Sequence, residues 1–180
     1  MNNPPILSIR AATPADNLLL AELGRQAFFE AFAADNTPED MAAYLAGAFS
    51  PEKQAAELAD PATRFLIAEA EGAPAGFARL RAGPAPDCVQ GQRPIEIVRF
   101  YSLKAWIGRG VGPALMRACL EHAEQAGYGV VWLDVWELNP RAIAFYRKWG
   151  FETVGTQAFQ LGSDRQTDLL MSREVATAPL

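Results

Sequence analysis

The sequence predicts an α/β (α+β) protein in which helices flank a mixed, largely antiparallel sheet of six or seven strands. Three observations lead to this fold class. Apolar segments of strand length recur along the chain from residue 6 to residue 172. Ser-Pro, Thr-Pro and Asn-Pro pairs, which are typical helix starts, stand between these segments. One pair of strand-like segments is joined by a short glycine-containing turn, as in an antiparallel hairpin.

The first part of the chain is predicted to hold one short strand and three helices. Residues 6–10 form the strand. A helix starts at Thr13, because a threonine cap is followed by a proline at the first position and an acid in the first turn. Thr37 and Ser50, each followed by proline, repeat this signal, so two shorter helices follow.

The rest of the chain is predicted to alternate between strands and helices. Residues 65–71 and 75–81 flank the turn Gly72-Ala73-Pro74 and form the hairpin, and the proline-rich residues 83–94 form a loop. The remaining elements are a central strand over 95–101, a helix over about 112–126, a strand over 130–136, a helix from Asn139, and closing strands near 153–161 and 166–172. We expect a single domain over residues 1–173 and a flexible tail over 174–180.

Composition narrows the classes of protein to consider. Half of the residues are hydrophobic and 21% are charged, which is ordinary for a globular enzyme. The net charge of −5 argues against nucleic-acid binding and permits a cationic substrate. No secretory signal or membrane-spanning run is present, so we expect a cytoplasmic protein without a membrane partner. Cys88 and Cys119 are too few for a disulfide framework or a zinc site, and no metal is expected.

The glycine-rich segment Ile107-Gly108-Arg109-Gly110-Val111-Gly112 follows the central strand and opens into a helix. Glycines at alternate positions leave the backbone N–H groups open to a ligand, and the helix adds free amides and the positive end of its dipole. Such a turn can bind a phosphate or pyrophosphate. The spacing fits neither a P-loop nor a dinucleotide fingerprint. A turn without any ligand remains the alternative.

A second motif begins at Asn139 and ends at Phe151. Asn139 is a good helix cap, and apolar residues including Tyr146 recur at helical spacing behind it. Gly150 supplies a left-handed stop and Phe151 a hydrophobic contact behind it. Taken alone, these features also describe a short amphipathic core helix.

Together, the two motifs make the chain resemble the GNAT superfamily of N-acetyltransferases. The family's acetyl-CoA signature, Arg/Gln-x-x-Gly-x-Gly/Ala, falls on residues 107–112, where Ile107 replaces the usual Gln or Arg. The later motif Asn-x-x-Ala-x-x-Phe-Tyr-x-x-x-Gly-Phe is matched from Asn139 to Phe151. The resemblance implies a GNAT-like fold and an acetyl-CoA-dependent N-acetyltransferase, with acetyl-CoA as co-substrate.

The resemblance also implies roles for individual residues. Two neighbouring strands separate near Tyr101, Ser102 and Leu103, so that freed backbone groups bind the pantetheine arm of acetyl-CoA and an amide polarises the thioester. The cofactor-binding positions are Tyr101, Ser102, Leu103, Gly108, Arg109, Gly110, Val111, Gly112, Asn139 and Tyr146.

Two of the residues are candidates for proton transfer. Tyr146 donates a proton to the departing sulfur, with a plain core aromatic as the alternative. Glu96 accepts the amine proton directly or through water, and a structural acid paired with Arg99 or Arg79 is the competing interpretation. His122 lies mid-helix between acids and is excluded from catalysis.

A narrower likeness concerns the acceptor. The segments 96–103, 132–139 and 159–168, together with 36–49, resemble the PaiA group of bacterial spermidine/spermine acetyltransferases. This suggests a small-molecule amine as partner, in particular a polyamine. An amino acid, an antibiotic, a protein N-terminus or a catalytically silent acyl-CoA-binding regulatory module remain the alternatives, and a homodimer is left open.

Four acids of the early helices could attract a cationic acceptor. They are Glu30, Asp35, Glu39 and Asp40. Acids in first helical turns also stabilise the helix through its dipole, which needs no substrate.

Overall fold

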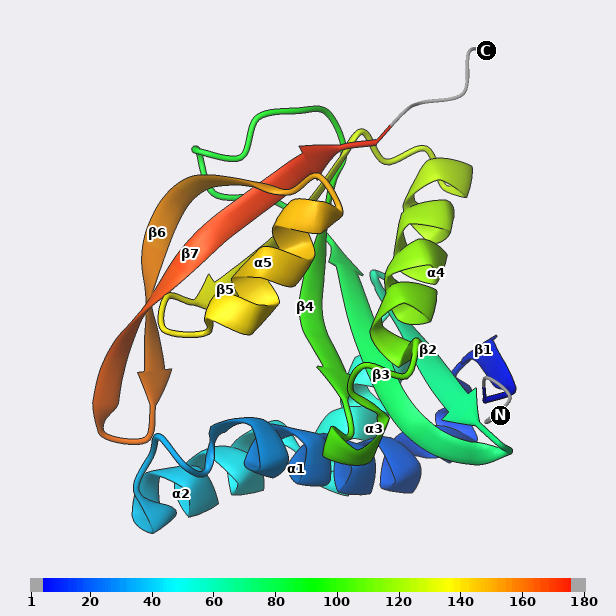
Figure 1. Ribbon diagram of the computed structural model, residues 1–180. Helices are drawn as coiled ribbons and strands as arrows, with labels where there is room; N and C mark the ends of the chain where they lie inside the picture. The colour runs from blue at the N-terminus through cyan, green and yellow to red at the C-terminus, as the bar shows by residue number, and fades with distance from the viewer. Residues whose placement is uncertain (1–4, 176–180) are drawn as a thin grey trace.

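The computed structural model describes residues 5–175, which form a seven-stranded sheet, five α-helices and two short 3-10 helices (Figure 1). The strands are β1 (Leu7–Ala11), β2 (Thr63–Ala70), β3 (Ala73–Ala82), β4 (Pro94–Ser102), β5 (Val130–Trp136), β6 (Glu152–Leu161) and β7 (Asp164–Glu174). The helices are η1 (Pro14–Asp16), α1 (Asn17–Phe32), α2 (Pro38–Ala48), α3 (Pro51–Ala59), η2 (Lys104–Trp106), α4 (Val111–Gln125) and α5 (Pro140–Lys148).

The sheet has the strand order β1-β2-β3-β4-β5-β7-β6. All neighbouring strands are antiparallel except β4 and β5, which are parallel. The predicted fold class, a mixed and largely antiparallel sheet flanked by helices, is therefore confirmed. No helix in the described part of the chain is both long and apolar enough to cross a membrane.

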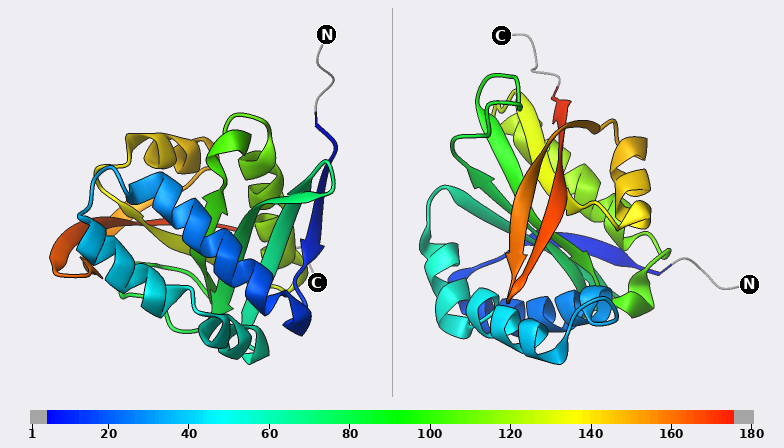
Figure 2. Two further views of the ribbon diagram at one scale, coloured as in Figure 1. Left: turned by 90° about the horizontal axis from the view of Figure 1, so that it is seen from below. Right: turned by 90° about the vertical axis from the view of Figure 1, so that its left-hand side faces the viewer.

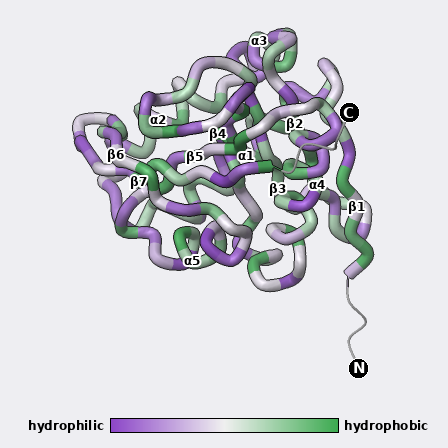
Figure 3. The backbone as a smooth tube through the Cα atoms, turned by 90° about the horizontal axis from the view of Figure 1, so that it is seen from above, coloured by the Kyte–Doolittle hydropathy of each residue, from purple (hydrophilic) through white to green (hydrophobic). Residues whose placement is uncertain are grey.

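Helices cover both faces of the sheet. Helices α4 and α5 pack on one side, which we call the α4 face, and their apolar residues share a core with β2 to β5. Helices α1, α2 and α3 cover the other side, the α1 face (Figure 2). A second core lies there and is rich in aromatic rings. Hydrophobic and hydrophilic segments follow one another along the chain (Figure 3). The residues that α4 buries are apolar, whereas α3 buries Gln54 and Glu57.

Several predicted boundaries differ from the observed ones by one or more residues, among them one near each end of the described chain. The helix expected at Thr13 begins as a 3-10 turn, because the Asp16 carboxylate accepts hydrogen bonds from Thr13 and is paired with Arg10 at 2.8 Å. Helix α1 itself starts at Asn17. At the other end, Glu174 still belongs to β7 rather than to a tail, and residues 176–180 lie outside the described part of the chain.

The parallel strands β4 and β5 separate soon after they meet (Figure 1). Their pairing is confined to Pro94–Glu96 and Val130–Trp132. Beyond these residues β4 pairs only with β3, and β5 only with β7. A bulge leaves Val98 without a partner on β3, and bulges bend the strand that carries them. The separation expected near Tyr101–Leu103 thus begins earlier, directly after Glu96.

Candidate active site

A cavity of about 1010 Å³ occupies the opening between β4 and β5. Its walls come from α1 and α2 on one face of the sheet, and from α5 and the start of α4 on the other. Strands β4 to β7 line it between these helices. The cavity therefore connects the two faces, and each face supplies a different set of side chains.

The glycine-rich turn lies at the α4-face end of this cavity. Gly110 caps α4 in the left-handed region with φ of 93°, and no side chain caps the helix. No described residue accepts a hydrogen bond from the N–H groups of Val111 or Gly112. Free amides at the positive end of a helix dipole favour an anion, so this end of the cavity fits the pyrophosphate of a CoA-type molecule.

Only some of the residues predicted for this turn line the cavity. Gly108 and Gly112 line the cavity, as does Ile107. Arg109, Gly110 and Val111 are not among the lining residues. The Arg109 guanidinium lies 5.3 Å from the centre of the Trp106 ring, and the Val111 side chain is buried in the core.

The predicted positions on β4 and before α5 mostly reach the cavity. Tyr101, Ser102 and Asn139 line it, whereas Leu103 does not. The Leu103 N–H instead donates to the Ala75 carbonyl at 2.9 Å. The Asn139 carboxamide oxygen accepts from a backbone N–H of α5 at 3.1 Å, so the sequence expectation of a helix cap is confirmed here.

Tyr146 lies on α5 and lines the cavity on the α4 face. Its ring packs against Phe100, Phe145 and Phe151 with centroid separations of 5.6 to 6.1 Å. Burial raises the pKa of the Tyr146 hydroxyl above its ordinary value, and the nearby Asp134 adds to this shift. The phenol therefore keeps its proton at neutral pH, as a proton donor must.

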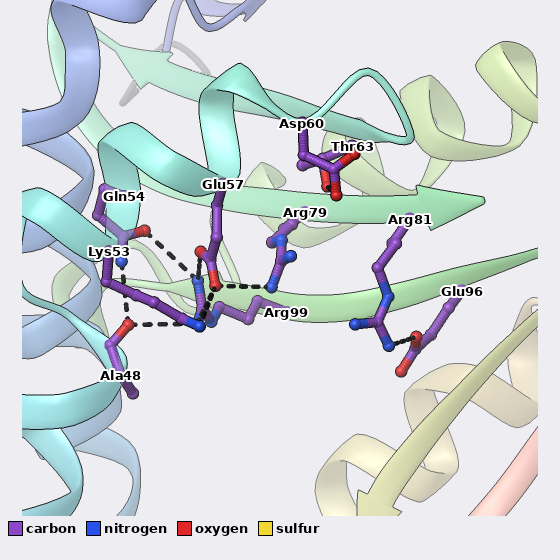
Figure 4. A network of polar contacts seen from close by, with 10 residues as sticks. All are labelled: Ala48, Lys53, Gln54, Glu57, Asp60, Thr63, Arg79, Arg81, Glu96 and Arg99. Carbon is purple, nitrogen blue, oxygen red and sulfur yellow. Dashed lines mark hydrogen bonds and ion pairs between the residues drawn. The ribbon is translucent and has the colours of Figure 1, made fainter. Parts of the chain in front are cut away.

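Glu96 also lines the cavity, at the point where β4 and β5 separate. Its carboxylate is paired with Arg81 at 2.7 Å (Figure 4). The pairing with Arg99 or Arg79 that the sequence suggested is wrong, because β3 and β4 are in a register that sets Arg81 opposite Glu96.

Arg79 and Arg99 instead bind Glu57, which projects from α3 onto the sheet (Figure 4). The Glu57 carboxylate lies 2.9 Å from Arg79 and 2.6 Å from Arg99. Arg99 also donates to Gln54 and to the Ala48 carbonyl, so it ties α3 to the end of α2. All three charged side chains are buried. We call Glu57, Arg79 and Arg99 the Glu57 cluster.

Two further carboxylates line the α1-face half of the cavity, and the sequence analysis did not select them. Asp134 on β5 accepts a hydrogen bond from Gln157 at 2.7 Å. Asp168 on β7 is 6% exposed, and its Oδ1 atom has no hydrogen-bond partner among the described residues. Burial and the charge of Asp134 raise the pKa of Asp168 to about 7. We call Asp134 and Asp168 the acid pair.

Aromatic rings form much of the wall on this side. Phe28 and Tyr44 from the helices stack at 4.5 Å, and Phe32 meets Trp136 of β5 edge to face at 6.3 Å. Phe159 of β6 closes the wall against Tyr44. Aromatic faces carry negative potential and attract cations, so the rings and the acid pair favour the same kind of ligand.

The acids of the early helices are placed differently from one another. Glu30 lines the cavity, but its carboxylate accepts from the Lys104 N–H at 2.7 Å. Asp40 accepts from the backbone and hydroxyl of Ser163 and so joins α2 to the β6–β7 turn. Asp35 and Glu39 are exposed and are not lining residues.

A sequence signal for the acid pair does exist. Asp134 is the one acid within the apolar strand Val130–Trp136, and Asp168 directly precedes the apolar segment Leu169–Met171. The charge of a lone acid in a buried strand needs a partner within the protein, or the acid serves a function. Sequence reasoning selected Glu96 and the acids of the early helices and did not select Asp134 or Asp168.

Comparisons with known proteins show the family of this chain. The sequence profile of the Acetyltransferase (GNAT) family matches residues 25–151. An uncharacterised N-acetyltransferase of Lactobacillus delbrueckii subsp. lactis is 34% identical over 151 residues, which are 84% of this chain and 87% of that protein. An uncharacterised N-acetyltransferase of Mycobacterium tuberculosis is 35% identical over 138 residues, covering 77% and 84% of the two chains.

A solved structure shares the fold. The PaiA N-acetyltransferase of Thermoplasma acidophilum, crystallised in complex with coenzyme A, superposes with a TM-score of 0.75. The alignment covers 94% of this chain and 99% of that one, at 20% sequence identity.

Proposed function

The chain belongs to the acetyltransferase (GNAT) family and is an acetyl-CoA-dependent N-acetyltransferase, and from this premise we propose that it acetylates a primary amine of a small cationic molecule, most favourably a polyamine. One observation carries the proposal. A single cavity joins the free helix N-terminus on the α4 face to the acid- and aromatic-lined half on the α1 face. It thus offers one end to an anionic donor and the other to a cationic acceptor.

The α4-face half suits the donor. Acetyl-CoA supplies an acetyl thioester at the end of a pantetheine arm, with a pyrophosphate at the other end of that arm. The free N–H groups of Val111 and Gly112 would bind the pyrophosphate, although Pro113 contributes no N–H of its own. The unpaired edge of β4 beyond Glu96 would bond the arm as a neighbouring strand does.

Proton transfer needs one donor and one acceptor beside the opening. As the amine nitrogen bonds to the acetyl carbon and the carbon–sulfur bond breaks, Tyr146 gives its phenolic proton to the sulfur. The ammonium group loses one proton to Glu96 before the attack, directly or through water. The second proton, which the nitrogen loses as the amide forms, restores the phenol of Tyr146. Glu96 suits the first transfer because it stands where the strands separate, with Arg81 holding its carboxylate in place.

The acceptor half supports a cationic amine. Four acidic residues line the cavity, Glu30, Glu96, Asp134 and Asp168, together with several aromatic rings. The resemblance of several segments to the PaiA group adds support for a polyamine. The other acceptors that the sequence left open are an amino acid, an antibiotic or a protein N-terminus. Of these, an amino acid carries a carboxylate, which this acidic half would disfavour.

An amine panel tests the proposal directly. Purified protein is incubated with acetyl-CoA and one amine at a time, and release of the free thiol is followed. We expect turnover with polyamines and diamines, and much less with amino acids. A panel in which spermidine is inert while an amino acid is a good substrate would remove the polyamine assignment and leave the family assignment in place.

The role of Tyr146 is tested by Tyr146→Phe, which removes only the hydroxyl. We expect turnover to fall by roughly 10- to 10⁴-fold, the usual range for a general acid, while CoA affinity measured by calorimetry stays nearly constant. Tyr128→Phe is the matched control, because Tyr128 packs against Arg93 and is not a lining residue of the cavity. Near-normal turnover of the Tyr146 variant would make that residue a core aromatic.

A further inference from the structure

We propose that the acid pair, Asp134 and Asp168, binds a second, non-reacting ammonium group of the acceptor, so that the enzyme selects amines carrying two or more positive charges. This inference rests on the proposed function and specifies its acceptor. The argument uses three features of the pair: its missing partners, its position relative to the opening, and the walls around it.

The first feature is uncompensated charge. Asp168 is buried, and no hydrogen bond or ion pair from a described residue reaches its carboxylate. Asp134 has one hydrogen bond, from the neutral Gln157. A buried carboxylate without partners is costly, and proteins retain one mainly where function requires it. A bound ammonium group would supply the missing charge and donors.

The neighbouring charged groups do not offer an alternative partner. Glu137, which follows β5, is a further acid close enough to raise the pKa of Asp168. The guanidinium of Arg99 is held by Glu57, and that of Arg81 by Glu96. From α2, the residue that faces this region is Tyr44, whose own pKa is raised, chiefly by burial and further by Asp134 and Asp168. The charges that act on Asp168 are those of Asp134 and Glu137, and both are negative. Lys104, Arg141 and Lys148 also line the cavity, but none of them forms an ion pair with Asp168.

The second feature is position. Asp134 stands on β5, the strand beside the opening, and Asp168 stands on β7, the next strand outward. The pairings Asp134 with Leu170 and Trp136 with Asp168 make the two acids diagonal neighbours on one face. Adjacent strands lie about 4.8 Å apart, so Asp168 is set back from the opening by one strand spacing. An amine reacting in the opening would leave its far end beside Asp168.

The third feature is the wall. Trp136, directly opposite Asp168 in the sheet, and Tyr44 and Phe159 enclose this end of the cavity with aromatic surface. Such a wall suits the methylene chain between two amines, and the ring faces attract the terminal charge. An alkyl diamine or polyamine combines these two properties.

The test compares two amines that differ only in the second charge. Putrescine and butylamine have the same carbon chain, and kcat/KM is measured for each with saturating acetyl-CoA. For Asp168→Asn we expect the putrescine-to-butylamine ratio to fall roughly tenfold or more, since a charged hydrogen bond is lost. Glu152→Gln is the matched control: Glu152 is an exposed acid on β6 outside the cavity, and we expect it to leave the ratio unchanged.

The outcomes separate the inference from the proposed function. An unchanged ratio in Asp168→Asn overturns the inference and leaves the acetyltransferase proposal standing. An equal loss for both amines, with a lost limb in the pH–rate profile, would make Asp168 the proton acceptor and also overturn it. If neither amine is acetylated, the proposed acceptor class fails. Calorimetric titration of putrescine into the protein with CoA then decides whether Asp168→Asn weakens diamine binding, as the inference requires.

Discussion

The α1 face of the sheet carries two groups of charged side chains, the buried Glu57 cluster and the acid pair of buried Asp168 and half-buried Asp134, that differ in how their charges are balanced. In the Glu57 cluster one carboxylate meets two guanidinium groups, and Gln54 and a backbone carbonyl accept further N–H donors of Arg99. In the acid pair two carboxylates lie together, and only Asp134 has a hydrogen bond from a described residue. The first group binds α3 to β3 and β4, and the second opens into the cavity.

This difference distinguishes charged residues with a structural role from those with a binding role, although both kinds look alike in the sequence. A buried charge that is paired within the chain holds secondary-structure elements together. Removing one partner leaves the other charge buried and uncompensated, which strongly destabilises the fold. A buried charge that faces a cavity without a partner lowers the stability of the folded chain, and a ligand of opposite charge can neutralise it. Burial alone therefore does not reveal a site, and the balance of charge has to be considered with it.

Breaking the Glu57 cluster should have the largest effect on stability. Glu57→Gln removes the one negative charge between Arg79 and Arg99, so two buried guanidinium groups repel each other without compensation. We expect the free energy of unfolding to fall by about 3–5 kcal/mol, the usual cost of removing one partner of a buried ion pair. Urea denaturation followed by circular dichroism measures this change.

Glu52→Gln serves as the control on the same helix, because Glu52 is exposed in the first turn of α3. Its loss should cost no more than about 1 kcal/mol, through the helix dipole alone. A Glu57→Gln variant that unfolds at the same urea concentration as the Glu52→Gln variant would show that the cluster contributes little to the fold.

The opposite change is expected for the acid pair. Asp168→Asn keeps the shape of the side chain and removes a buried charge that has no partner, so the variant should be more stable than the native chain above pH 7. We expect a gain of about 1–2 kcal/mol, allowing for screening of the charge through the cavity. Thermal unfolding of both proteins without ligand measures it.

The pH dependence of this gain follows from the raised pKa of Asp168. The folded chain holds the proton up to about pH 7, whereas the unfolded chain releases it near the ordinary value of 3.8. Between these values the folded state binds more protons, so native stability falls as pH rises through this window. The advantage of Asp168→Asn should therefore be smaller at pH 5 than at pH 8. An advantage independent of pH would mean that charge is not its cause.

Much of the fold was predictable from local signals. The helix starts at Thr37, Ser50 and Asn139 lie where the sequence places them, because each is fixed by its own cap and a following proline. The strands followed from apolar segments bounded by turn residues. What local signals cannot supply is pairing, and the early separation of β4 from β5 depends on a bulge at Val98 that involves β3.

The cavity residues also divide into those that local sequence signals indicate and those that depend on tertiary structure. Gly108, Asn139 and Tyr146 belong to motifs, so the sequence indicates them, and each lines the cavity. The predicted pairing of Glu96 with Arg99 or Arg79 was wrong, because which arginine lies opposite Glu96 depends on strand register across a bulge. Asp168 was missed although it directly precedes an apolar segment, and the tertiary structure adds that no cation of a described residue pairs with it.

The smallest effect is expected from the exposed acids, which form a third class beside the two buried groups. Glu39 lies in the first turn of α2, is exposed, and is not a lining residue. At physiological ionic strength the Debye length is about 8 Å, so its charge is largely screened from the cavity. We expect Glu39→Gln to change the KM for putrescine by less than about twofold at this ionic strength.

Salt dependence then distinguishes the exposed acids from the acid pair. Added salt should erase any remaining difference between Glu39→Gln and the native enzyme, because that difference arises from long-range attraction through solvent. The loss of diamine preference in Asp168→Asn should persist, because an enclosed contact is screened far less than one through water. KM values for putrescine at low and high salt, measured for both variants, make the comparison. If the Glu39 variant shows the larger and salt-resistant defect, the acceptor charge is recognised at the surface of α2, and the buried acid pair has another role.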